Sequence, residues 1–135
     1  MTNGPLAGIR VLDLATMISG PLAGMMLADQ GAEVIKIESP GMGDMMRHLG
    51  TQKNGVTGLY ALHNRGKKSI VLDLKNDEGA TLLRELIGTA DVLIQNFRPG
   101  AMDRLGFGYD DVAKVNPKLI YVSIAGFGHD GPSAN

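Results

Sequence analysis

The sequence predicts an α/β fold with an open, doubly wound and mainly parallel sheet of about five strands, flanked by helices. Five short runs are rich in Val, Ile and Leu, as strands covered on both faces are. Stretches with helical periodicity fall between several of these runs. Nineteen glycines suggest many tight strand-to-helix turns. Repeated strand, helix and strand implies parallel pairing with right-handed crossovers.

The predicted strands follow one another along the whole chain. Only some of them alternate apolar with polar residues, which favours burial on both faces. In order, the strands are predicted over Ile9–Ala15, Glu33–Glu38, Ser69–Leu74, Asp91–Asn96 and Leu119–Ala125.

Helices are predicted between the strands from their capping residues and their apolar faces. The stretch "SGPLAGMMLADQGA" offers Ser19 as N-cap, Pro21 near the first turn and Gly31 as a stop. A short helix is expected over Gly58–His63, inside a long glycine-punctuated segment. The stretch "NDEGATLLRELIGTA" begins with two candidate caps, Asn76 and Asp77. Its apolar face is formed by Leu82, Leu83, Leu86 and Ile87.

Composition indicates one domain of an ordinary soluble protein and excludes several classes. Hydrophobic residues make up 44% of the 135 residues, and the net charge is −1, so no nucleic-acid or membrane surface is indicated. The absence of cysteine excludes disulfides and thiolate zinc sites. No signal peptide or bilayer-spanning run is evident, and we expect a cytoplasmic protein. His48, His63 and His129 are widely spread, so no metal site is expected.

The chain ends on a glycine pattern, Gly126-x-Gly128-x-x-Gly131, directly after the last predicted strand. A dinucleotide fingerprint needs a following helix and an acidic residue on a later strand, and neither follows here. The first strand-to-helix junction, where such a fingerprint belongs, also fails to match. We therefore interpret the pattern as a turn and expect no NAD.

Ligands of doubly wound sheets gather beyond the carboxyl ends of the strands, which directs attention to the segments that follow them. The helix start at Ser19 could hold an anion or a carbonyl oxygen, or could serve capping alone. The segment "PGMGDMMR" is similar, or Asp44 and Arg47 could simply pair on a helical turn. The cations Arg65, Lys67 and Lys68 precede the third strand, and Lys75 follows it. Lysine at that position suits phosphate binding, although it is usually a solvated strand end.

The segment "NFRPGAMDRLGF" follows the fourth strand and admits two interpretations. Phe97 beside Arg98 and Arg104 could receive a purine nucleotide. Alternatively, the segment is a surface turn with Phe97 in the core.

Three blocks taken together resemble the family III CoA-transferases, the CaiB/BaiF superfamily. They are "GIRVLDLATMISGPLAGMMLADQGAEVIKIESPGMGDMMR", "NRGKKSIVLDLK" and "ADVLIQNFRPGAMDRLGFGYDDVAKVNPKLIYVSIAGFGHDGP". This superfamily includes formyl-CoA transferase, carnitine CoA-transferase and α-methylacyl-CoA racemase. The resemblance implies that residues 1–135 form the N-terminal part of a Rossmann-like, CoA-binding large domain. It also implies a fold that is incomplete relative to the family, whose members are much longer.

The resemblance also implies a set of CoA-binding residues. Ile18 stands where some transferases carry glutamine, which argues against formyl-CoA, and Ser39 stands where several members carry a phosphate-facing arginine. The expected CoA-binding residues are Met17, Ile18, Ser19, Ser39, Leu72, Asp73, Leu74, Lys75, Asn96, Phe97, Arg98 and Arg104.

No catalytic residue is assigned within the chain. In the transferases an aspartate attacks the acyl-CoA carbonyl, and in the racemases a histidine and an aspartate exchange the α-proton. The resemblance places these residues beyond the "GFGxxGP" block, where this sequence ends. We expect CoA or acyl-CoA as ligand and either self-association or a missing C-terminal remainder. A racemase-type fragment, a freestanding CoA- or nucleotide-binding module acting with a partner chain, and a structural fragment without ligand remain alternatives.

Overall fold

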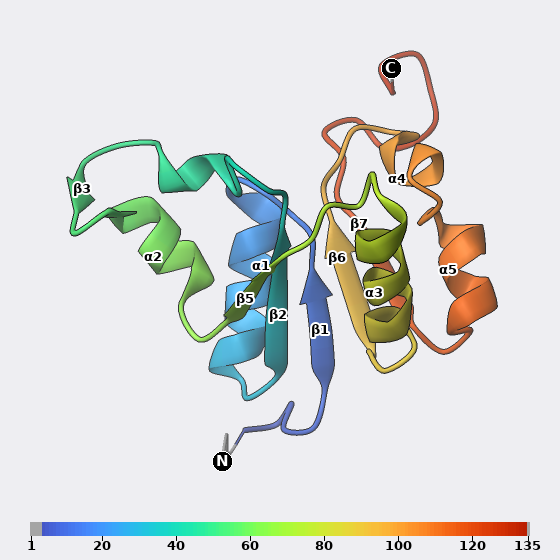
Figure 1. The fold of residues 1–135 in the computed structure, drawn as a ribbon, viewed down its shortest axis with the longest axis horizontal. Helices are drawn as coiled ribbons and strands as arrows, with labels where there is room; N and C mark the ends of the chain where they lie inside the picture. The colour runs from blue at the N-terminus through green and yellow to red at the C-terminus, as the bar shows by residue number, and fades with distance from the viewer. Residues whose placement is uncertain (1–3, 135) are drawn as a thin grey trace.

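The computed structural model describes residues 4–134 and confirms a five-stranded sheet with helices on both faces (Figure 1). Every neighbouring pair of strands is parallel, and the spatial order is β5-β2-β1-β6-β7. The strands are β1 (Arg10–Asp13), β2 (Glu33–Glu38), β5 (Lys68–Val71), β6 (Val92–Gln95) and β7 (Ile120–Ser123).

The order of the strands reverses direction between β1 and β6. From β1 the chain builds outward to β2 and β5, then crosses to β6 and β7 on the other side. Such a switch point leaves a crevice at the carboxyl ends of the two central strands, because their following loops diverge. The loops after β1 and β6 are therefore the natural walls of a ligand site.

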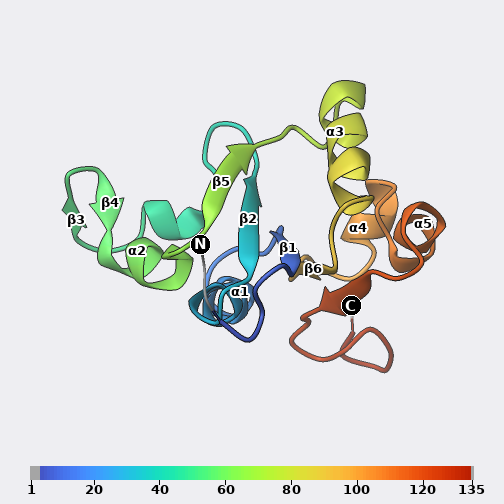
Figure 2. The same ribbon diagram turned by 90° about the horizontal axis from the view of Figure 1, so that it is seen from below.

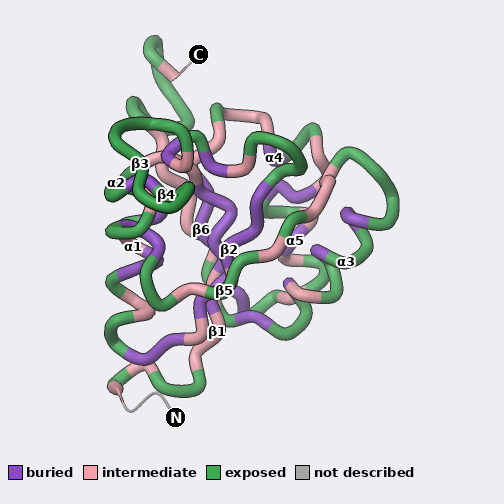
Figure 3. The backbone as a smooth tube through the Cα atoms, turned by 60° about the vertical axis from the view of Figure 1, so that its left-hand side comes forward, coloured by how far each residue is buried: buried purple, intermediate pink, exposed green. Residues whose placement is uncertain are grey.

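The helices divide between the two faces of the sheet (Figure 2). Helix α1 (Ser19–Asp29) covers one face and packs against α2 (Gly58–Asn64). Helices α3 (Asp77–Ile87), α4 (Ala101–Arg104) and α5 (Tyr109–Val115) cover the other face. Most buried backbone lies along the central strands (Figure 3). No helix within residues 4–134 is both long enough and apolar enough to cross a bilayer.

Most predicted strands are longer than the observed ones. The first was expected over Ile9–Ala15, yet its ladder covers only Arg10–Asp13. The predictions for β5 and β7 are too long at the carboxyl end because apolar residues continue beyond the ladder. The prediction for β6 is too long by one polar residue at each end, Asp91 and Asn96. Leu72 and Leu74, for example, follow β5 and still pack against the core.

Helix boundaries match the capping pattern at two of three places. Gly31 ends the turn after α1 with a φ of 100°, and Asn76 caps α3 by accepting from the Gly79 N–H. Ser19 is not the N-cap of α1; Ile18 occupies that position without a side-chain cap. The apolar face of α3 is narrower than predicted, because Leu83 and Ile87 are buried while Leu82 is exposed.

The segment between β2 and β5 contains the helical turn considered for Asp44 and Arg47, the expected short helix, and a hairpin that was not predicted. A short 3₁₀ turn, η1 (Met45–Arg47), precedes a hairpin of β3 (Gln52–Lys53) and β4 (Val56–Thr57). The hairpin turns at Asn54 and Gly55, which have φ values of 52° and 78°. An Asn-Gly pair is the sequence signal for a two-residue turn of this kind.

Exposed apolar side chains gather on helices α1 and α2 and at both edges of the sheet. β5 and β7 are the edge strands of the described sheet. Such surface promotes association between chains, and self-association, measured by light scattering, stays a prediction. The large apolar residues concerned include Leu22, Met26, Leu59, Leu62, Val71, Ile120 and Phe127.

Candidate functional site

The loops that follow β1 and β6 are joined by one side-chain amide. The Thr16 N–H donates to Asn96 Oδ1 at 2.9 Å, and Asn96 Nδ2 donates to the Thr16 carbonyl at 2.8 Å. The two hydrogen bonds join the loops after β1 and β6 in the way that a further pair of backbone hydrogen bonds between the two strands would. Asn96, one of the predicted CoA-binding residues, thus contacts the neighbouring loop in this structure.

Met17 and Ile18 form the turn that leads into α1. Met17 has a φ of 67°, a left-handed conformation that is uncommon for a residue with a branched or bulky side chain. Its N–H donates to Asp44 Oδ1 at 3.0 Å. Ile18 is 50% exposed, and Ser19 is also exposed. Met17 and Ile18 therefore lie directly before α1, and Ser19 is its first residue, at the carboxyl end of the sheet.

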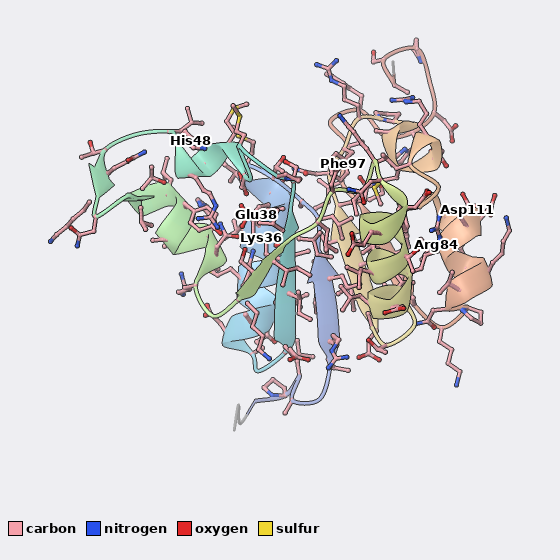
Figure 4. All side chains as sticks on the ribbon, viewed as in Figure 1. Lys36, Glu38, His48, Arg84, Phe97 and Asp111 are labelled. Carbon is pink, nitrogen blue, oxygen red and sulfur yellow. The ribbon has the colours of Figure 1, made fainter. Side chains whose placement is uncertain are left out.

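Beside this turn lies a pocket of about 160 Å³ that contains half of the predicted site residues. Its floor is apolar, formed by Leu14, Ile37 and Leu105, and its rim carries polar groups. Phe97 (labelled in Figure 4) lines the pocket and also packs against the core, so its place beside the core is confirmed, and its contact with a nucleotide stays a prediction. The predicted residues that line it are Ser39, Leu72, Asp73, Leu74, Lys75 and Phe97.

Two hollows next to this pocket bring the predicted cations together. Lys75 and Arg104 line one hollow of about 380 Å³ at the start of α3. Arg98 and Arg104 line another of about 410 Å³, together with the glycine-rich segment around Gly126–Gly128. Within residues 4–134, no ion pair involves Lys75, Arg98 or Arg104. These cations are therefore available to an anionic ligand.

The cations that precede β5 are, in contrast, engaged with carboxylates. Lys67 Nζ lies 2.6 Å from Asp13 Oδ2, and both side chains are almost completely buried. Burial lowers the pKa of Lys67, and the charge of Asp13 acts in the opposite direction. The other two pairs, Arg65 with Asp29 and Lys68 with Glu33, lie nearer the surface. The charges of Arg65, Lys67 and Lys68 are therefore matched by carboxylates of the same chain.

The expected pairing of Asp44 with Arg47 is wrong. Asp44 caps η1 by accepting from the Met46 N–H at 3.0 Å, and its Oδ2 lies 2.8 Å from Lys36 Nζ. Arg47 instead makes two hydrogen bonds of 2.7 Å to Glu38. The backbone of Asp44 is extended just before η1, and its carboxylate therefore faces the Met46 N–H and Lys36 on β2 rather than the side chain of Arg47.

Glu38 collects donors from several segments at the carboxyl end of β2. Besides Arg47, it accepts from the Asp44 N–H and from the hydroxyls of Tyr60 and Ser69. Burial favours the neutral carboxyl, but these donors outweigh burial and lower the pKa of Glu38 to about 2. The guanidinium of Arg47 also lies 3.9 Å from the centre of the Tyr60 ring. Glu38 is therefore a structural anion beside the pocket.

No group of three or more metal-ligating side chains occurs in the described part of the chain. The histidines have other contacts: His63 Nδ1 lies 2.8 Å from the Leu59 carbonyl, and His129 Nε2 lies 2.7 Å from Ser123 Oγ. The terminal glycine pattern follows β7 without a helix as far as residue 134, as expected for a turn.

Comparison with known proteins agrees with this arrangement. The model of the CoA-transferase family III matches residues 6–135. The chain is 48% identical over 98% of its length to an acetyl-CoA:oxalate CoA-transferase of Acetobacter aceti, of which it covers 34%. It is 49% identical over 97% of its length to a succinate–glutarate CoA-transferase of Agrobacterium fabrum, of which it also covers 34%.

A solved structure has the same fold. A CaiB/BaiF family protein from Brucella suis superposes with a TM-score of 0.92 at 44% identity, covering 98% of this chain and 36% of that one. The chain thus spans about a third of the length of the curated relatives it matches. Because the family model matches almost the whole chain, this protein belongs to the CoA-transferase family III.

Proposed function

We propose that this chain is the N-terminal, CoA-binding part of an acyl-CoA:carboxylate CoA-transferase. One observation carries the proposal: an apolar pocket with an aromatic wall opens beside cations that form no ion pair within the described residues 4–134. An adenine ring requires a flat apolar slot, and phosphates require positive charge at its mouth. The pocket and the neighbouring hollow supply both.

The nucleotide end of CoA fits the pocket that Phe97 lines. We place the adenine against Phe97, between Leu72 and Leu74, and the phosphates at Lys75 and Arg104. Arg104 offers a planar pair of donors suited to phosphate oxygens, and Lys75 adds a mobile point charge. Arg98 extends the positive surface on the other side of Arg104. Ser39 leaves the rim uncharged where several relatives have arginine.

The pantetheine arm then extends toward the turn at Met17 and Ile18, which brings the thioester to the carboxyl ends of β1 and β6. The backbone N–H groups at the uncapped start of α1 suit the carbonyl oxygen of an acyl group. Residues 1–135 would bind and orient the thioester, and the nucleophilic aspartate of the family is expected beyond Asn135. We therefore assign no catalytic residue here.

The names of the relatives favour transfer between carboxylates over racemisation. Both curated relatives described above are CoA-transferases, one named for oxalate and the other for succinate and glutarate. We propose acyl-CoA as donor and a small carboxylate as acceptor, with CoA as the ligand and the cytoplasm as the location. A second copy or the remainder of a longer chain would cover the exposed apolar surface of α1 and α2.

Isothermal titration calorimetry with CoA tests the proposal directly. Arg104→Ala removes a charge-assisted phosphate contact worth about 1.5–3 kcal/mol, so the Kd for CoA should rise about tenfold to a hundredfold. Arg65→Ala is the matched control, because Arg65 is an exposed arginine that pairs with Asp29 away from the pocket. It should leave the Kd unchanged.

Two results would contradict the proposal. Folded wild-type protein that releases no heat at millimolar CoA would mean that residues 1–135 form no CoA site of their own. Equal Kd values for wild type and Arg104→Ala would mean that the phosphates lie elsewhere.

A further inference from the structure

The turn between β1 and α1, residues 15–18, is held in place from both sides by one buried ion pair. Lys36 Nζ donates to the Ala15 carbonyl at 2.8 Å, and Asp44 Oδ1 accepts from the Met17 N–H at 3.0 Å. Lys36 Nζ and Asp44 Oδ2 are themselves 2.8 Å apart. The ion pair therefore links the carbonyl of Ala15 to the N–H of Met17, two positions further along the turn.

Burial of this pair is almost complete, with side-chain exposures of 1% for Lys36 and 0% for Asp44. Two charges removed from water carry a large desolvation penalty, and apolar residues of similar size are often at least as stabilising. Stability alone is therefore a weak reason for an ion pair at this position. Its direct contacts with the backbone of the turn suggest a different role.

Met17 shows what the pair accomplishes. Its φ of 67° is strained for a residue other than glycine, and such strain persists only where the surroundings over-determine the conformation. Asp44 supplies that restraint, and its own position is held by its N–H bond to Glu38 and by its bond from the Met46 N–H. With the backbone held, the side chain of Ile18 is left 50% exposed just before α1.

We propose that Lys36 and Asp44 are positioning residues that hold Met17 and Ile18 in the conformation that receives the thioester end of CoA. Neither side chain touches the ligand, because both are buried beneath the turn (Figure 4 labels Lys36 on β2). The inference rests on the proposed CoA function, but the conformation of the turn can be measured without any ligand.

The first measurement is amide hydrogen exchange by NMR in Lys36→Met, which keeps the apolar stem of the side chain and removes its charge. The amides of Thr16 and Met17 should exchange at least about tenfold faster, relative to the amides of β6, than they do in the wild type. Asp44→Asn is a milder variant, because it keeps an oxygen that can accept from Met17. It should give a smaller change at the same amides and covers the case in which Lys36→Met does not fold.

Lys67→Met is the matched control. Lys67 is as buried as Lys36 and is paired with Asp13 in the same way, but its other hydrogen bonds go to the Pro21 carbonyl and to Asn64. Asp13 accepts from the Ala15 N–H at the start of the turn, and neither member of this pair bonds to Thr16 or Met17. Thr16 and Met17 should keep their exchange rates relative to β6 in this variant. Equal acceleration in Lys36→Met and Lys67→Met, or unchanged Met17 exchange in both Lys36→Met and Asp44→Asn, would overturn the positioning role.

The second measurement compares two ligands. Adenosine 3′,5′-bisphosphate carries the nucleotide end of CoA without the pantetheine arm. Lys36→Met should weaken CoA at least about tenfold while leaving the Kd for the bisphosphate unchanged, because only the arm reaches the turn. Equal weakening of both ligands would overturn the inference. If the wild type binds neither ligand, the proposed function fails, and the exchange data still decide whether the pair holds the turn.

Discussion

The two faces of the sheet differ in how their buried residues change along the strands. On the face covered by α3, α4 and α5, strands β1 and β2 remain apolar to their ends, with Leu12 and Ile37 in one cluster with Leu83, whereas β6 ends on the buried, uncharged Gln95. On the face covered by α1, the strands begin with Val11 and Val34 but end with charged residues. The buried charged residues at those ends are Asp13, Lys36 and Glu38.

This difference follows from what each kind of interaction provides. Apolar burial is non-directional and stabilises the fold in proportion to the area removed from water. Charged hydrogen bonds are directional, and a buried one that loses its partner is strongly destabilising. The charged groups of the α1 face gather at the carboxyl ends of the strands, where a ligand site needs defined geometry. Both faces therefore contribute to stability, but only the charged side chains of the α1 face also hold the loops at the carboxyl ends of the strands.

The largest expected effect comes from breaking a buried pair on the α1 face. Lys67→Met leaves Asp13 buried and uncompensated, so the free energy of unfolding should fall by about 3–5 kcal/mol. Urea denaturation followed by circular dichroism measures the loss. Adding Asp13→Asn should recover part of it, because the buried charge is then removed. Asp29→Asn breaks the exposed pair with Arg65 and should cost at most about 1 kcal/mol.

A comparable loss on the other face should have a different consequence for the site. Leu83 is completely buried in α3, so Leu83→Ala should cost about 2–5 kcal/mol in the same denaturation experiment. Because α3 makes no hydrogen bond to the turn at Met17, the relative exchange rate of the Met17 amide should not change. Selective loss of protection at Met17 in Leu83→Ala would break the proposed division between the faces.

The smallest effect concerns acid. The pKa of Glu38 is about 2 in the folded protein, below its ordinary value of 4.5. Its ionised form therefore contributes stability that is fully present above about pH 4.5 and is lost as the pH falls toward 2. Glu38→Gln should be less stable than the wild type at neutral pH, and the difference should shrink between pH 4.5 and 2. A constant difference across this range would show that charge on Glu38 does not matter.

Local patterns in the sequence predicted some contacts of the site and missed others. Asn76 was correctly predicted as a cap, because its side-chain oxygen accepts from the Gly79 N–H only three residues further along the chain. The same reasoning from spacing failed for Asp44 and Arg47. Spacing cannot show that Lys36 pairs with Asp44 and that Glu38 pairs with Arg47. The hairpin at Asn54–Gly55 was missed although its turn signal is present in the sequence. The strand predicted over Ser69–Leu74 was too long at its carboxyl end, because Leu72 and Leu74 pack against the core although the hydrogen-bonded strand ends at Val71.

Periodicity, turn residues and ordered motifs are local or linear properties, and they were enough to predict the parallel α/β sheet, which the structure confirms. They also predict a ligand at the carboxyl edge and, through the family resemblance, a set of CoA-binding residues, and both stay predictions. Which charges are buried and which are available to a ligand could be seen only in the folded chain. Lys67 meets Asp13 across 54 positions and Asn96 meets Thr16 across 80, and the strength of such contacts depends on distance and burial in space.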